Sequence, residues 1–264
     1  MLGKLLKYEF KATGRIYLPM ILLVVVLTPI TRILTQLDIF KGVLEIIPGM
    51  TVLAYVLSLV GIGVAAYIIF IYRFYKNLIT PEGYLMFTLP VSSHSLVLSK
   101  AIVAFFWQII STLIVIASIL GMVYTPEIWQ NVIDEWNKIQ YQFSMIPNFN
   151  INGFIALIIA SIVVSAIYNI FYLYCAVSVG QSMARNKILG SVAAAMVIYI
   201  VTQVISTVVM MPFAFNANAL EDDITLWGSM ASGVICVGIL VSAVLAVVYY
   251  FVSTYFLSKK LNLE

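Results

Sequence analysis

The uncharged stretch Ile46–Tyr72, IIPGMTVLAYVLSLVGIGVAAYIIFIY, decides the fold class of this chain. A helix needs about 20 consecutive apolar residues to cross a hydrocarbon core of roughly 30 Å. Five further stretches of the chain meet this requirement. We therefore predict six transmembrane helices, near residues 16–36, 46–72, 101–124, 152–180, 188–211 and 227–257.

The composition supports the same class. The chain is 63% hydrophobic and 9% charged, whereas soluble domains average nearer half and a quarter. We expect an all-α integral membrane protein whose residues 1–264 form one transmembrane domain. The net charge of +3 sums two oppositely charged faces, so it indicates no nucleic-acid partner. Cys175 and Cys236 lie in different predicted spans, where they act most simply as small apolar side chains.

The charges are divided between the two sides of this layout. If the first span enters from the cytoplasm, eleven of the fourteen Lys and Arg residues lie inside, and eight of the eleven Asp and Glu residues lie outside. An excess of Lys and Arg in short loops marks the cytoplasmic side. Both termini are therefore predicted to be cytoplasmic. The inner basic residues are Lys4, Lys7, Lys11, Arg15, Arg73, Lys76, Lys100, Arg185, Lys187, Lys259 and Lys260.

Two amphipathic segments flank the spans. In residues 1–15, Lys4, Lys7, Lys11 and Arg15 form one helical stripe, which predicts an elbow helix on the inner membrane surface. The alternative is an ordinary basic flank without a defined helix. Between the third and fourth spans, an outer-face surface helix is predicted, where anchoring explains the residues more simply than a gate. Its apolar positions are Trp129, Val132, Ile133, Trp136, Ile139 and Phe143.

The predicted spans contain no centrally placed acid, and the single histidine, His94, lies in a cytoplasmic connection. Because proton relays use Asp, Glu or His at bilayer depth, ion-coupled transport is disfavoured. Metalloprotease, redox, nucleophile-elbow and phosphate-loop motifs are also absent from the sequence. We expect no enzymatic activity, no metal site and no cofactor in this chain.

Scattered polar residues within the spans have two interpretations. Hydrogen bonding between helices, at about 0.6 kcal/mol each, is the simpler one. Lining a substrate path is the other, and it is given equal weight only for Asn169 and Gln203, which are expected to be buried near mid-span.

The connection Arg73–Lys100 is long and apolar for a loop. Thr80, Pro81 and Glu82 are typical of a helix start, with an N-cap followed by proline at the first helical position. Pro90 would end this short helix, and Ser92 or Ser93 would begin the next one. The pattern predicts a short cytoplasmic projection of a shape suited to a groove in a partner protein.

At these residues the sequence resembles the permease subunits of type-2 ABC exporters, especially those of Gram-positive bacteria that move peptides or peptide antibiotics. The resemblance lies in the phrases FYKNL at 74–78, EGY at 82–84 and FTLP at 87–90, and in the amino terminus MLGKLLKYEF. The six-span layout covers the whole chain, but the matching sequence motifs lie only in residues 1–10 and 74–90.

The resemblance implies that residues 82–89 form a coupling helix that docks on a separate ATPase subunit. The implied coupling residues are Lys76, Glu82, Gly83, Tyr84, Phe87 and Leu89. It also implies a bacterial cell membrane location, a second permease copy and a cargo such as an amphipathic peptide or lipid-like molecule. ATP and magnesium would be held by the partner. Two rivals stay open: a non-transporting immunity or regulatory protein that binds a toxin or sensor, and a secondary carrier.

Overall fold

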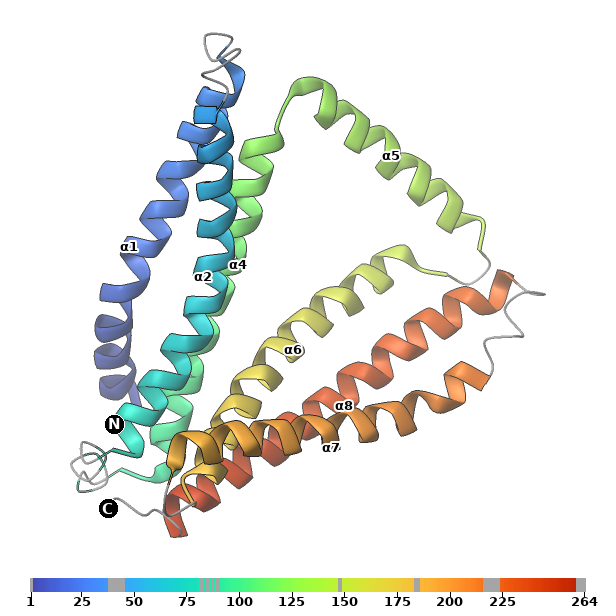
Figure 1. The fold of residues 1–264 in the computed structure, drawn as a ribbon. Coiled ribbons are helices and arrows are strands. Elements are labelled where there is room, and N and C mark those ends of the chain that lie inside the picture. The colour runs from blue at the N-terminus through green and yellow to red at the C-terminus, as the bar shows by residue number, and fades with distance from the viewer. Residues whose placement is uncertain are drawn as a thin grey trace. The chain divides into compact units, whose positions relative to one another are not determined.

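The computed structural model describes residues 2–37, 46–80, 83, 86, 88, 91–146, 149–182, 186–215 and 224–259, and the helices lie within these ranges. Within them the chain forms helices and no strand. The helices are α1 (Leu2–Gln36), α2 (Ile46–Leu78), α4 (Ser93–Val123), α5 (Pro126–Ser144), α6 (Ile151–Gly180), α7 (Lys187–Phe215) and α8 (Ile224–Lys259) (Figure 1).

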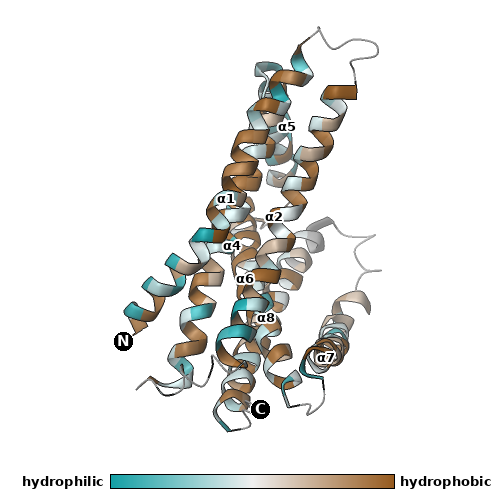
Figure 2. Cartoon of the chain, turned by 60° about the vertical axis from the view of Figure 1, so that its left-hand side comes forward, coloured by the Kyte–Doolittle hydropathy of each residue, from teal (hydrophilic) through white to brown (hydrophobic). Residues whose placement is uncertain are grey.

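Among the described residues, six helices are long and apolar enough to cross a membrane: α1, α2, α4, α6, α7 and the Met230–Lys259 part of α8. Apolar residues run along these helices, as the brown parts of the cartoon in Figure 2 show. The predicted all-helical class, with six helices long and apolar enough to span a membrane, is confirmed. Each helix has 29 to 36 residues, more than the roughly 20 that a span requires.

The amino-terminal basic segment does not form a separate helix. Residues 2–36 make one continuous helix, so no boundary at residue 15 divides the predicted elbow from the first span. Its basic stripe, Lys4, Lys7, Lys11 and Arg15, is exposed, as an interfacial helix requires. The polar residues of this segment are visible at the amino-terminal end of α1 in Figure 2. Pro19 lies inside α1 and removes one backbone hydrogen bond without ending the helix.

Close packing divides the chain into two units, each described here by itself. Unit 1 comprises Met1–Phe74 and His94–Gln130, and unit 2 comprises Tyr75–Ser93 and Asn131–Glu264. The expectation of one transmembrane domain stays a prediction.

In unit 1, α1 and α4 run parallel to each other and α2 runs antiparallel to both. At one end, Glu9 of α1 meets residues near the end of α2 and the start of α4. At the other end, the Arg32 guanidinium donates to the backbone carbonyls of Gly121 and Tyr124, where α4 ends. This is the direction that three consecutive membrane crossings require.

Unit 2 repeats this alternation with α6, α7 and α8. The turn between α6 and α7 brings the helices so close that a Cβ added to Gly180 would lie 2.2 Å from backbone atoms of Ser191. Further along, the Tyr172 hydroxyl donates to the Ala195 carbonyl at 2.8 Å. Helix α8 packs against both other helices through Tyr249. The Tyr249 ring contacts Tyr168 and Tyr172 of α6, and its hydroxyl hydrogen-bonds to the Thr202 hydroxyl of α7.

The predicted surface helix between the third and fourth spans is confirmed as a helix, α5. Pro126 occupies its first position, and the Thr125 hydroxyl accepts a hydrogen bond from the Ile128 amide at 3.2 Å. On its polar face, Lys138 donates to Glu135 at 2.6 Å, and this hydrogen bond raises the pKa of the Lys138 ammonium above its usual range. The placement of α5 on the outer face stays a prediction.

Candidate functional site

Three charged side chains meet at the end of unit 1 where α1 begins, and we call them the Glu9 cluster. One carboxylate oxygen of Glu9, Oε2, accepts hydrogen bonds from Arg73 Nη2 at 2.7 Å and Nε at 3.1 Å. The other oxygen, Oε1, accepts from Lys100 Nζ. Glu9 and Lys100 are only 8% and 5% exposed. One carboxylate therefore joins α1, α2 and α4.

The sequence of α1 positions this carboxylate. Glu9, Thr13 and Tyr17 recur every four residues, so they share one face of the helix. The Thr13 hydroxyl accepts a hydrogen bond from the Trp107 indole at 2.8 Å and donates to the Glu9 carbonyl at 2.7 Å. The Tyr17 ring stacks on Trp107 with centroids 4.7 Å apart. Trp107 of α4 thus packs along the face that carries Glu9.

Because the Glu9 cluster is buried, its charges must stay paired with one another. A charge removed from water is tolerated only when it is paired and hydrogen-bonded. Removing one partner from a buried pair usually costs about 3–5 kcal/mol, because the remaining charge stays buried. The Glu9 carboxylate accepts three hydrogen bonds, two from Arg73 and one from Lys100. The cluster therefore favours one arrangement of the three helices at this level.

Two members of the Glu9 cluster flank the connection that resembles a coupling element: Arg73 lies before it on α2, and Lys100 lies after it on α4. Arg73 precedes the last residue of α2, Leu78, by roughly one and a half turns, and Lys100 follows the start of α4 by roughly two turns. Since α2 and α4 are continuous through these positions, a displacement at either end of the connection would act on Glu9 and thereby on α1. The arrangement is suited to transmitting movement.

The connection itself begins with a tight turn after α2. The Ile79 amide donates to the Tyr75 carbonyl at 2.9 Å, and the Thr80 hydroxyl donates back to the Lys76 carbonyl. The Gly83 amide then donates to the Thr80 carbonyl at 2.7 Å. Of the predicted helix start at Thr80, Pro81 and Glu82, only Thr80 lies within the described residues.

Two of the implied coupling residues fall within the described chain. Lys76 is half-buried in the last turn of α2, and Gly83 is buried. A Cβ added to Gly83 would lie 2.7 Å from the Leu78 carbonyl oxygen, which is closer than real contacts allow. Glycine is therefore required by the close approach of two backbone segments. The other implied coupling residues, Glu82, Tyr84, Phe87 and Leu89, lie outside the described residues. Only residues 83, 86 and 88 of the expected helix 82–89 are described, so this helix stays a prediction.

Neither candidate for a substrate path, Asn169 or Gln203, is buried in the structure. Asn169 is partly exposed, and its amide nitrogen donates to the Ser165 carbonyl of its own helix at 2.8 Å. Gln203 is exposed, so its expected burial is wrong for this chain taken alone. The inward position on α7 belongs to the preceding residue, Thr202, whose hydroxyl bonds to the Tyr249 hydroxyl of α8. A role of Asn169 and Gln203 in translocation stays a prediction.

From the sequence, Arg73 and Lys100 are placed among the cytoplasmic charges but are not grouped with Glu9. A signal was present, because Glu9 is the one acid within the basic amino-terminal segment and shares its helical face with Thr13 and Tyr17. Its partners could not be found, since they come from α2 and α4. Trp107 was missed for the same reason.

Among the described residues, no group of three or more His, Cys, Asp or Glu side chains is placed to hold a metal ion. Comparison with protein-family models, with curated proteins and with solved structures gave no match. The structure itself shows a helical chain with six helices that are long and apolar enough to cross a membrane, which is consistent with a multi-pass membrane protein.

Proposed function

We propose that this chain is the membrane permease subunit of an ATP-driven ABC exporter in a bacterial cell membrane. A separate cytoplasmic ATPase would bind the connection between α2 and α4 and supply the energy, with ATP and magnesium on the partner. Two permease copies would enclose the path. The proposed cargo is an amphipathic peptide, a peptide antibiotic or a lipid-like molecule, because the spans are apolar and carry few ionisable groups.

The Glu9 cluster is the observation that carries this proposal. It ties together the two helices that leave the connection and links both to α1 through one buried carboxylate. A permease without an energy source of its own needs a rigid link of this kind between a cytoplasmic docking segment and its membrane helices. The backbone packing at Gly83 adds a second rigid point within the connection.

The mechanism follows from differential binding. ATP binding would close the two ATPase subunits and shift the docked connection, and α2 and α4 would tilt together because Glu9 holds them. A partner changes a conformational equilibrium only as far as it binds the two states with different affinity. The permease therefore contributes two conformations and no chemistry.

Substrate-stimulated ATP hydrolysis tests the docking assignment. The double substitution Glu82→Ala and Tyr84→Ala is expected to abolish stimulation in reconstituted complexes while membrane insertion and purified yield stay unchanged. Lys138→Ala, an exposed position on α5, serves as the matched control and should retain full stimulation. Unchanged stimulation in the double variant would overturn the assignment of residues 82–89 as the docking segment.

Purification from membranes separates the exporter from its rivals. A stoichiometric ATPase that is retained with the tagged chain in mild detergent would support the exporter, and its loss in the double variant would place the contact. An immunity or regulatory protein would be purified without an ATPase and would protect cells without moving cargo. A secondary carrier would stop on collapse of the ion gradient and continue after ATP depletion.

A further inference from the structure

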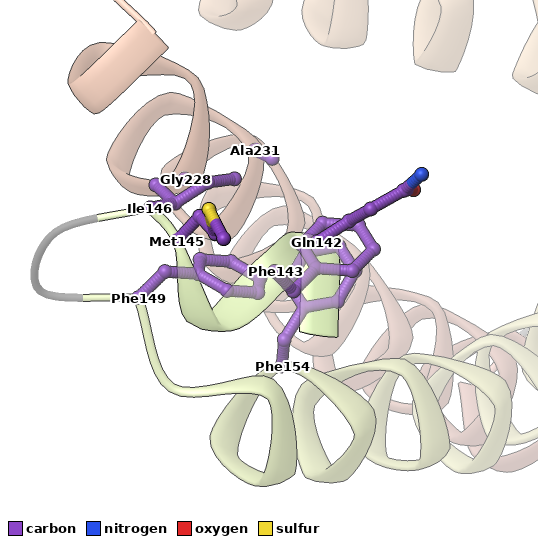
Figure 3. Close-up of a pocket in the computed structure, with 8 residues that line it drawn as sticks. All are labelled: Gln142, Phe143, Met145, Ile146, Phe149, Phe154, Gly228 and Ala231. Carbon is purple, nitrogen blue, oxygen red and sulfur yellow. The ribbon is translucent and has the colours of Figure 1, made fainter. Parts of the chain in front are cut away.

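Unit 2 contains an apolar pocket with a volume of about 530 Å³ (Figure 3). The end of α5, the start of α6 and the start of α8 contribute its walls. Its volume is within the range of about 300–1,000 Å³ that is usual for small-molecule sites. The pocket is separate from the Glu9 cluster, which belongs to unit 1.

Three phenylalanines, Phe143, Phe149 and Phe154, contribute to the wall. The rings of Phe143 and Phe149 stack with centroids 5.1 Å apart, and the rings of Phe149 and Phe154 lie 5.3 Å apart. A Cβ added to Gly228 would lie 2.5 Å from Cδ2 of Phe149, so the Phe149 ring occupies space that a larger residue at 228 would fill. Glycine at this position allows the three rings to assemble.

The start of α6 is held in place by its N-cap. The Asn150 side-chain oxygen accepts hydrogen bonds from the amides of Asn152 at 3.1 Å and Gly153 at 3.2 Å. The Phe154 amide donates to the Asn150 carbonyl at 2.9 Å. This capping fixes the first turn of α6, and with it the position of the Phe154 ring.

The pocket lies close to the ends of two membrane helices and continues an apolar surface. Phe154 lies in the first turn of α6 and Ala231 in the second turn of α8, roughly 5–10 Å along each helix. One turn further, Ile158 and Val234 are exposed on the same helical faces. α6 and the Met230–Lys259 part of α8 are long and apolar enough to cross a membrane. In that setting these faces would contact lipid chains, and a chain would enter the pocket along them.

We propose that this pocket binds one acyl chain of a membrane phospholipid. Among the residues that the structure describes, the lining side chains carry no charge, and Gln142, whose amide is the polar group among them, directs that amide away from the rings in Figure 3. An acyl chain brings no polar group that needs a partner. A peptide would bring backbone N–H and C=O groups, which are costly to bury without hydrogen bonds. The lining therefore favours a hydrocarbon chain over a peptide cargo.

Photolabelling of the purified full-length chain in nanodiscs tests the proposal. The probe is a phosphatidylcholine that carries a diazirine on one acyl chain, and the labelled residues are mapped by mass spectrometry. We expect labelling at 142–154 and 228–231 to exceed that of other lipid-facing segments. Ala231→Trp fills the pocket and should lower this labelling at least fivefold, whereas Ala231→Leu should lower it partly.

The matched control is Ala156→Trp, because Ala156 is exposed on α6 and lies two residues beyond Phe154, on a different face. It should leave labelling of the pocket unchanged. Uniform labelling of all lipid-facing segments, or equal labelling in the Ala231 variants, would overturn the proposal. A photoreactive amphipathic peptide is used in parallel, and preferential labelling of the pocket by that peptide would also overturn it. The assay needs no ATPase, so its result is independent of the proposed transport function.

Discussion

The two units use the same alternation of three helices but hold it together in different ways. In unit 1, α1 is joined to α2 and α4 by charges and by hydrogen bonds of Thr13, Trp107 and Tyr17. In unit 2, aromatic rings and close backbone packing join the helices, with Tyr249 near the centre and Gly180 at the turn. Both units also contain neutral hydrogen bonds between helices, such as that of Tyr172 with the Ala195 carbonyl in unit 2. The difference is that unit 1 adds a buried charge cluster, whereas the contacts described between helices in unit 2 are uncharged.

This difference has a mechanical consequence. A buried charge cluster has one low-energy arrangement, because separating its members leaves charges without partners. Packed rings can shift past one another at smaller cost, and unit 2 also contains a cavity. We expect unit 1 to move as a rigid body and unit 2 to admit adjustment.

The largest expected effect concerns the Glu9 cluster. Glu9→Gln leaves the buried Lys100 ammonium without a carboxylate, so the free energy of unfolding should fall by about 3–5 kcal/mol. Denaturant titration of the purified chain in detergent measures it. Glu135→Gln, which removes the acid of an exposed pair, should have no measurable effect. If the two variants lost equal stability, unit 1 would not depend on its charges.

A double variant sharpens this prediction. Adding Lys100→Met to Glu9→Gln removes the stranded ammonium and should restore a substantial part of the lost stability, because the desolvation penalty disappears with the charge. No recovery would show that the loss in Glu9→Gln has a different origin.

The second effect concerns the close packing of unit 2. Gly180→Ala places a methyl group 2.2 Å from backbone atoms of Ser191, so α6 and α7 must separate, at a cost of about 1–3 kcal/mol. Thermal unfolding of the purified variant measures it. Gly61→Ala in α2 is the control, since no atom lies within 4 Å of the added Cβ. That control should gain roughly 0.5–1 kcal/mol from helix propensity, so the two substitutions are expected to differ in sign.

The smallest expected effect is the difference in stability loss between two threonine substitutions, one in each unit. Thr13→Val leaves the Trp107 indole N–H without an acceptor, and we expect a loss of about 1.5 kcal/mol. Thr202→Val leaves the Tyr249 hydroxyl free to rotate to another partner, so the loss should be near 0.6 kcal/mol. Denaturant titration of both variants under one condition measures the difference. A larger loss for Thr202→Val would reverse the comparison between the units.

Hydrophobicity along the chain predicted the fold class and all six spans, because a membrane helix satisfies its backbone hydrogen bonds within itself and needs only an apolar surface. Periodicity predicted α5 for a related reason, since its apolar stripe is local in sequence. The elbow was not found as a separate helix. Nothing in Gly14 or Arg15 stops a helix, and Pro19 interrupts one hydrogen bond without ending α1.

The candidate site was predicted only in part. Gly83 was singled out by resemblance, and its close approach to Leu78 supplies a physical reason for glycine. Gln203 was expected to be buried, but the neighbouring Thr202 occupies the inward position. At 100° per residue, one step along α7 separates an inward from an outward side chain, and an apolar helix shows no pattern that distinguishes them.

The sequence by itself determined that the chain has six stretches long and apolar enough to cross a membrane as helices, because transfer of apolar surface out of water depends on local composition. It also determined which segments are amphipathic. Only the tertiary structure decided that Glu9 pairs with Arg73 and Lys100, and that Phe154 and Gly228 share one pocket. These residues are far apart in the chain, and contacts between helices depend on rotation and register, which hydropathy does not encode.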